Sequence, residues 1–212
     1  MDRGEKIKIV FFLAAVAVLA LAMGYLFLTY GPEQTLRFLV DQDSHTALFA
    51  VLLAVLPVLG FPLSVLLLMA GVKMGFWWGM ALFAALVPLH MLLTHLLTHT
   101  FIRGPLEYIL AKYSKEMPLI ARKRAIFFVV IFTGFPGLPY AVKNCFLSLS
   151  NIPLPVYLLA AWPMHVVLAA PFVGVGGSAA RADWRLGLLF AVLLVVVYFL
   201  GRWLKAKFSN DS

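Results

Sequence analysis

Residues 125–151 read AIFFVVIFTGFPGLPYAVKNCFLSLSN, an apolar run that is interrupted in its middle by Gly134, Pro136, Gly137 and Pro139. Proline removes a hydrogen-bond donor from a helix, and an unpaired backbone group is costly in lipid. Such a break is therefore tolerated only where protein or a water-filled cavity covers it. The pattern favours a hairpin that enters a membrane and returns on the same side. The alternative is a kinked helix packed within a bundle.

A second broken segment lies earlier in the chain, at residues 46–75. Here Gly60-Phe61-Pro62 resembles Gly137-Leu138-Pro139, and a small residue, Gly71 or Ser148, follows nine positions after the proline in each case. Proline-interrupted segments at matching places in two halves are the best sequence pointer to a transporter's substrate site near the membrane midplane. The two segments therefore mark a candidate binding site.

The composition of the whole chain identifies lipid as its solvent. Of 212 residues, 63% are hydrophobic and 12% charged, and the mean hydropathy is +0.98. A water-soluble domain cannot hide that much apolar surface. The formal net charge of +8 does not indicate a nucleic-acid binder, because the Lys and Arg residues lie in short runs beside apolar segments.

The apolar runs predict about four transmembrane helices. The first run, Ile7 to Leu28, is longer than the apolar core of a signal peptide, so we expect an uncleaved helix. The predicted units are an N-terminal transmembrane helix at 1–30, an interfacial segment at 31–45, a core at 46–178 with hairpins at 46–75 and 125–151 and spans at about 76–102 and 156–176, a C-terminal transmembrane helix at 184–204, and a cytoplasmic tail at 205–212.

The positions of the basic residues predict the topology. Cytoplasmic loops are rich in Lys and Arg, and basic clusters lie at the N-terminus, at 103–124 and at the C-terminus. Four spans with two re-entrant hairpins place all three clusters in the cytoplasm, whereas six full spans require a further adjustment near the N-terminus. The expected fold is an all-α integral membrane protein whose two hairpins enter from opposite sides as inverted repeats.

Few charged residues lie within the predicted spans. All nine acidic residues fall in termini, connectors or interfacial stretches, whereas Lys73 and Lys143 lie among apolar residues, with Asn144 beside the latter. A lysine at membrane depth needs water, a partner or an anionic ligand, so both are candidate site residues. The alternative is that each side chain extends to the membrane surface.

The span at about 76–102 is the third apolar segment of the chain, and we call it the third span; its histidines, His90, His95 and His99, raise a different possibility. His95 and His99 have the i, i+4 spacing of two metal ligands, but a third ligand has to come from elsewhere, for example from His165. We expect these histidines to form hydrogen bonds between helices instead. The chain has no nucleophile or nucleotide-binding motif. We therefore expect no enzyme activity, no metal and no cofactor.

Residues 125–151 resemble the conserved core of the DedA and VTT-domain family, also called SNARE-associated Golgi proteins. The family pattern is an arginine, two residues, a proline, two residues, a second proline, an aromatic residue, and an asparagine four positions later. Pro136, Pro139, Tyr140 and Asn144 match it. The first half agrees as well, with Pro62 followed by spaced glycines. The resemblance covers about residues 46–178.

Two departures from the family pattern are visible. Thr133 occupies the position of the family's arginine, and no acidic residue lies between Thr46 and Gly75. The resemblance implies lipid scrambling or recycling of polyprenyl-phosphate carriers, in a bacterial inner membrane. The departures argue against proton coupling and against phosphate recognition by arginine, and they make Lys143 a candidate replacement cation.

The sequence therefore predicts a lipid transporter or scramblase with a cleft between the two hairpins. Its partners are membrane lipids, either phospholipid or polyprenyl phosphate; no nucleic acid is expected, and a homo-oligomer is compatible with the sequence. The alternatives are a membrane-embedded metal enzyme that uses the histidines of the third span and a non-transporting membrane scaffold. The candidate substrate-binding residues are Pro62, Lys73, Thr133, Pro136, Pro139, Tyr140, Lys143 and Asn144.

Overall fold

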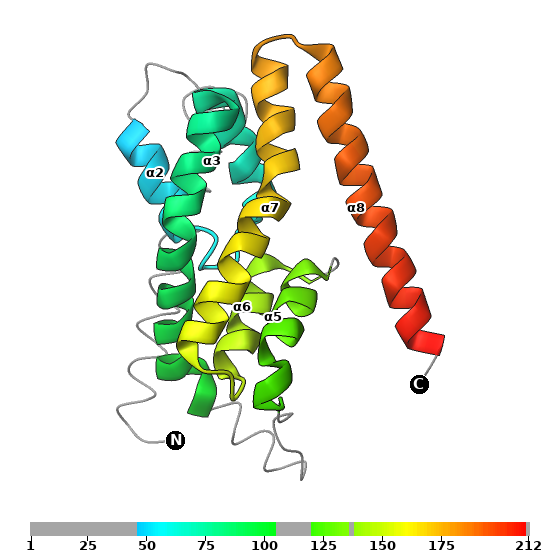
Figure 1. Cartoon of the computed structure of the whole chain (residues 1–212). Coiled ribbons are helices and arrows are strands. Elements are labelled where there is room, and N and C mark those ends of the chain that lie inside the picture. The colour runs from blue at the N-terminus through cyan, green and yellow to red at the C-terminus, as the bar shows by residue number, and fades with distance from the viewer. Residues whose placement is uncertain (1–45, 105–119, 136–137, 211–212) are drawn as a thin grey trace.

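The computed structural model describes residues 46–104, 120–135 and 138–210, and within these ranges every regular element is a helix (Figure 1). Pro136, the predicted first helix and the interfacial segment lie outside the described residues. The elements are α2 Thr46–Val55, α3 Leu63–Leu97, the π-helical turn η1 Thr98–Ile102, η2 Arg122–Arg124, α5 Ala125–Gly134, α6 Tyr140–Leu149, α7 Leu154–Ala180 and α8 Trp184–Asn210. Helix α8 thus continues beyond residue 204, where we expected a tail to begin.

Prolines explain where three of these helices begin. Pro62, Pro139 and Pro153 directly precede α3, α6 and α7, and each has an extended ψ, of 109°, 147° and 135° respectively. Proline has no N–H to donate, and its ring disfavours a helical conformation in the residue before it. A helix therefore starts readily just after a proline, although α3 continues through Pro88 and α7 through Pro163 and Pro171.

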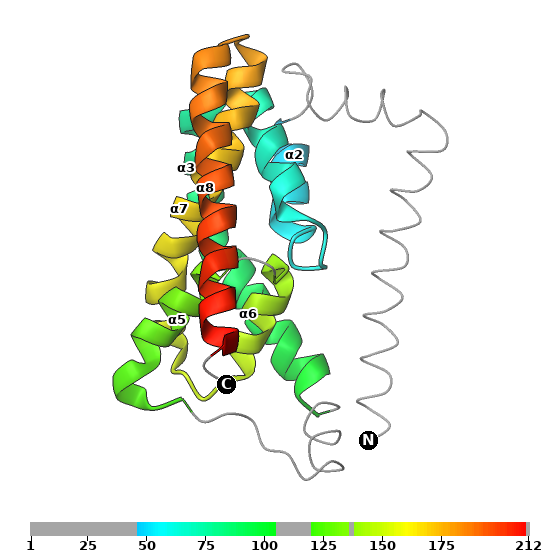
Figure 2. The same cartoon turned by 90° about the vertical axis from the view of Figure 1, so that its right-hand side faces the viewer.

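A glycine divides α3 into two arms. Gly75 has φ 74° and ψ 177°, a conformation that is readily accessible only without a Cβ. The chain reverses there, so the first arm, residues 63–74, runs back along α2, and the second arm continues for most of the length of the molecule (Figure 2). We call α2 with the first arm of α3 the first hairpin, and α5 with α6 the second hairpin.

The two hairpins approach the middle of the molecule from opposite ends. The turn of the first hairpin, residues 56–62, and the end of α5 both lie near mid-height of α7 (Figures 1 and 2). The first hairpin comes from the end where α7 meets α8, and the second from the other end. Both hairpin tips therefore lie next to the middle of α7.

Helix α7 packs closely on the first arm of α3 through glycines. A Cβ at Gly71 would lie 2.1 Å from the Val173 carbonyl oxygen, and one at Gly176 would lie 2.0 Å from that of Leu68. Only hydrogen fits at these two positions, which is the small-residue packing typical of membrane helices. On the second arm, Phe83, Val87 and Met91 join a core with α5, α6 and α7.

The outer surface of the bundle is apolar. Leu159 and Val167 on α7 are 71% and 65% exposed, and most large side chains of α8 between Trp184 and Val196 are exposed as well. Two helical stretches, Leu63–Ile102 and Leu154–Ala180, are long and apolar enough to cross a membrane. With 27 residues, α7 is about 40 Å long, against a hydrocarbon thickness of about 30 Å.

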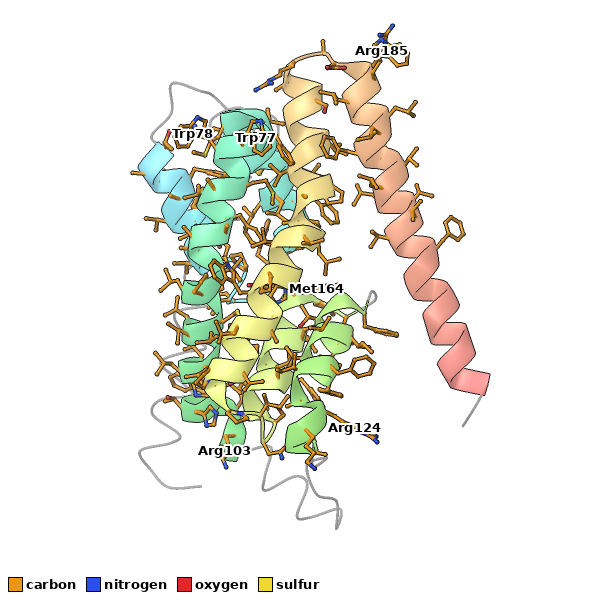
Figure 3. All side chains as sticks on the ribbon, viewed as in Figure 1. Trp77, Trp78, Arg103, Arg124, Met164 and Arg185 are labelled. Atoms are coloured by element: carbon orange, nitrogen blue, oxygen red, sulfur yellow. The ribbon has the colours of Figure 1, made fainter. Side chains whose placement is uncertain are left out.

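Charged and aromatic side chains lie at the two ends of this surface. Trp77, Trp78 and Arg185 lie at one end, and Arg103 and Arg124 lie at the other (Figure 3). Tryptophan and arginine commonly occupy the interface between lipid and water. The side-chain distribution is that of a helical bundle with an apolar belt.

Candidate functional site

A cavity of about 530 Å³ lies at the hairpin tips. This volume is within the usual range of small-molecule sites, about 300–1,000 Å³. The first hairpin lines it with residues 60–64 and Leu67, the second with Gly134, Leu138–Ala141 and Lys143, and the remaining walls come from α7 (His165, Leu168, Ala169, Pro171, Phe172) and α8 (Leu194, Val197). The cavity thus lies between the two segments that the sequence marked as broken.

Among the lining residues that the structure describes, Lys143 is the only one that carries a formal charge. Its side chain is 8% exposed, and its Nζ donates to the Thr133 carbonyl oxygen at 2.8 Å. Helix α5 ends at Gly134, so this carbonyl belongs to the last turn, where carbonyls lack partners within the helix and carry partial negative charge. One hydrogen bond uses one of the three ammonium hydrogens, and the same side chain also lines the cavity.

Asn144 connects α6 to α7 behind the cavity wall. The side chain is fully buried, and its Oδ1 accepts hydrogen bonds from the Tyr157 hydroxyl at 2.8 Å and from His165 Nε2 at 3.1 Å. Within the described part of the chain, its Nδ2 has no partner. Asn144 therefore acts on the cavity through His165, whose imidazole it orients.

His90 connects the first hairpin to Tyr140 of the second. Its Nε2 lies 2.8 Å from the Leu53 carbonyl oxygen, and its Nδ1 lies 3.3 Å from the Tyr140 hydroxyl. Since a carbonyl only accepts, Nε2 carries the hydrogen, and Nδ1 of the neutral ring accepts from Tyr140. Helix α2 ends at Val55, so Leu53 also lies in a last turn. In each hairpin, a basic side chain thus satisfies a carbonyl near the end of the first helix: Lys143 of α6 in the second hairpin, and His90 of the second arm of α3 in the first.

The structure brings four of the predicted site residues together and separates others. Pro62, Pro139, Tyr140 and Lys143 line the cavity. The other described candidates do not: Lys73 is buried near the Gly75 reversal, Asn144 lies behind the wall, and Thr133 contributes its carbonyl to Lys143. The Thr133 hydroxyl oxygen is buried and has no partner among the residues that the structure describes.

Sequence reasoning did not assign His165, Tyr157 or His90 to this site. His90 was grouped with the other histidines of its span because it is close to them in sequence. The available signal was a polar residue in an otherwise apolar helix, which needs a hydrogen-bond partner when it is buried. That signal identifies such residues but does not identify their partners on distant helices.

His95, near the end of α3, and His99, in η1, are not among the described lining residues of the cavity. Ser148 Oγ is 2.9 Å from His95 Nδ1, and His99 Nε2 donates to the Ser148 carbonyl oxygen at 3.0 Å. Arg103 donates to His99 Nδ1 at 3.2 Å. Both ring nitrogens of His99 are thus engaged with protein groups. Across residues 46–104, 120–135 and 138–210, no three His, Cys, Asp or Glu side chains come together as a metal site.

Comparisons with family models, curated proteins and solved structures gave no match to this chain.

Proposed function

We propose that this protein is an integral membrane protein that moves an anionic lipid across the bilayer through the cavity between its hairpins. The lipid is a phospholipid or a polyprenyl phosphate. The observation that carries the proposal is the position of Lys143, a buried cation that lines a cavity between the two broken segments.

In the proposed topology, four helices span the membrane and the two hairpins are re-entrant, in an inverted-repeat arrangement. The hairpin tips meet at mid-height of α7 after approaching from opposite ends (Figure 1). Arg103 and Arg124, at the ends of the basic connector, lie at the same end of the molecule as the C-terminal end of α8 (Figures 1 and 3). The positive-inside rule makes this end cytoplasmic, with both termini on that side.

The chemistry of the cavity favours an anion. Lys143 supplies one positive charge, and Tyr140, His165 and Ser64 add polar atoms, whereas no lining residue in the described part of the chain is acidic. A positive charge in a low-dielectric site interacts more strongly with an anion than it does in water. A phosphate group satisfies the remaining ammonium donors, whereas a choline or ethanolamine cation meets no carboxylate.

The family resemblance supports the same activity. Thr133 stands where the DedA and VTT-domain pattern has its arginine, and the Lys143 ammonium lies 2.8 Å from the Thr133 carbonyl oxygen. Lysine from α6 thus supplies a cation next to the position where the family's arginine is expected. We propose membership of that family on this basis, with a bacterial inner membrane as the location.

Reconstitution in liposomes tests the proposal. Purified protein is incorporated into vesicles that contain a trace of fluorescent phosphatidylglycerol, and a membrane-impermeant reductant then bleaches the outer leaflet. We expect inner-leaflet label to become accessible in the presence of protein, and fluorescent phosphatidylcholine to move more slowly. Fluorescent polyprenyl phosphate is assayed in the same way. Movement of both anionic lipids at the rate of protein-free vesicles refutes the function.

A further inference from the structure

One face of α8 faces the rest of the bundle. Gly187, Phe190, Leu194 and Val197 are spaced by three, four and three residues, which places them along a single helix face. The neighbouring Val195 and Val196 are each 53% exposed on the outer side. We call the first four residues the inner face of α8.

The first half of this inner face makes close contacts. A Cβ at Gly174 of α7 would lie 2.4 Å from the Phe190 ring, so the ring packs directly on the glycine backbone. The same ring stacks on Phe76 with centroids 5.4 Å apart. Gly187 lies over Ser178, where a Cβ would be 3.6 Å from the serine Cβ. These contacts close the α7–α8 seam near the turn that joins the two helices.

The second half of the inner face lines the cavity. Leu194 and Val197 are lining residues, together with Leu168 and Phe172 of α7. From their connecting turn onward, α7 and α8 diverge (Figure 1). The seam between α7 and α8 is therefore closed at Phe190 and opens into the cavity at Leu194 and Val197. The walls of the seam at that point are apolar.

The polar and apolar groups of the cavity come from different elements. Lys143 and Tyr140 belong to α6 of the second hairpin, whereas Leu194 and Val197 belong to α8. An amphiphile has the same division, with a charged head and an apolar chain. Burial of each chain methylene away from water is favourable, so the chain follows the apolar wall.

We propose that the chain of the transported lipid leaves the cavity between α7 and α8, along Leu194 and Val197, while its anionic head group contacts Lys143. This inference rests on the proposed function and deepens it, because it assigns the route of the chain. The seam is closed between Phe190 and the turn that joins α7 to α8, so the lipid chain passes on the C-terminal side of Phe190.

Photolabelling of the full-length protein in detergent tests this route. The probe is hexadecyl phosphate with a diazirine at the middle of its chain, and the control probe is the corresponding hexadecanol. We expect the phosphate to label Leu194 and Val197, and Lys143→Met to reduce this labelling about tenfold through loss of a charged hydrogen bond. The alcohol should label mainly the outer face, at Val195 and Val196.

The outcomes separate this inference from the transport proposal, because labelling requires binding only. Labelling of Leu194 and Val197 without lipid movement in liposomes refutes transport and supports the chain route. Lipid movement with labelling confined to Val195 and Val196 supports transport and overturns the route.

A pair of tryptophan variants gives a second test. Leu194→Trp narrows the cavity wall and should slow lipid movement, whereas Val195→Trp adds the same bulk on the outer face and should not. Equal rates for the two variants contradict the proposed chain route.

Discussion

The ammonium of Lys143 is buried next to the C-terminal end of α5. Two opposing effects act there on the stability of the protein. A lysine at membrane depth costs about 2.5–3.5 kcal/mol, whereas a hydrogen bond to a charged group contributes about 1.5–3 kcal/mol. The bond to the Thr133 carbonyl therefore offsets most of the burial cost. We expect Lys143→Met to change the free energy of unfolding by no more than about 1 kcal/mol, as measured by denaturant titration in detergent. A larger loss shows that Lys143 is chiefly a structural residue.

Asn144 Oδ1 accepts hydrogen bonds from two side chains at once. We therefore expect substitutions of Asn144 and of its partners to have non-additive effects on stability. Asn144→Leu leaves the Tyr157 hydroxyl and His165 Nε2 without their acceptor, which should lower the free energy of unfolding by about 2–4 kcal/mol. Adding Tyr157→Phe removes one orphaned donor and should recover about 1 kcal/mol. Strict additivity of the two single substitutions contradicts the inferred network.

At the scale of elements, the α3–α7 contact depends on glycine backbones. Gly176→Ala places a methyl group 2.0 Å from the Leu68 carbonyl oxygen, and two backbones cannot separate without loss of neighbouring contacts. We expect destabilisation of about 2 kcal/mol or more, seen as a lower thermal midpoint. Gly187→Ala is the matched control, because its nearest neighbour lies at an ordinary 3.6 Å. Similar midpoints for the two variants argue against the close approach.

The turn between α7 and α8 contains a residue in an unfavourable conformation. Ala182 has φ 51°, and the bonds from Ala182 N to Ala179 O and from Asp183 N to Ser178 O form a Schellman motif, which normally has glycine at this position. Ala182→Gly should raise stability by about 0.5–1 kcal/mol.

The same substitution two residues earlier provides the control for this turn. Ala180 lies in α7, so Ala180→Gly should lower stability by about 0.5–1 kcal/mol, because glycine disfavours a helix. If both substitutions raise stability, or both lower it, the result contradicts the assigned turn.

At the scale of the whole molecule, local sequence rules predicted the helix starts but not the helix contacts. The starts of α3 and α6 follow from Pro62 and Pro139, because a missing N–H acts locally. The contact of Gly176 with Leu68 joins residues far apart in sequence. The type of one residue does not predict which distant residue it will contact. For the same reason, both Lys73 and Lys143 were candidate site residues as embedded charges, and the tertiary packing places Lys143, but not Lys73, among the described lining residues of the cavity.

The proposed topology predicts which end of the molecule is reachable from outside the cell. In a Cys145→Ala background, a membrane-impermeant maleimide should label Ala180→Cys in intact cells. Lys123→Cys, at the end marked by Arg124 (Figure 3), should be labelled only after permeabilisation. Labelling of Lys123→Cys in intact cells reverses the orientation, and labelling of neither variant in permeabilised cells shows that the sites are not at the surface.

The most direct test of the account compares two lysine variants in liposomes. Lys143→Met removes the cation of the cavity, and Lys123→Met makes the same change at an exposed position. We predict that movement of fluorescent phosphatidylglycerol slows about tenfold for Lys143→Met, because a charged hydrogen bond is lost along the path. Lys123→Met should match the unmodified protein. Equal transport rates for the two variants contradict the claim that an anionic head group passes Lys143.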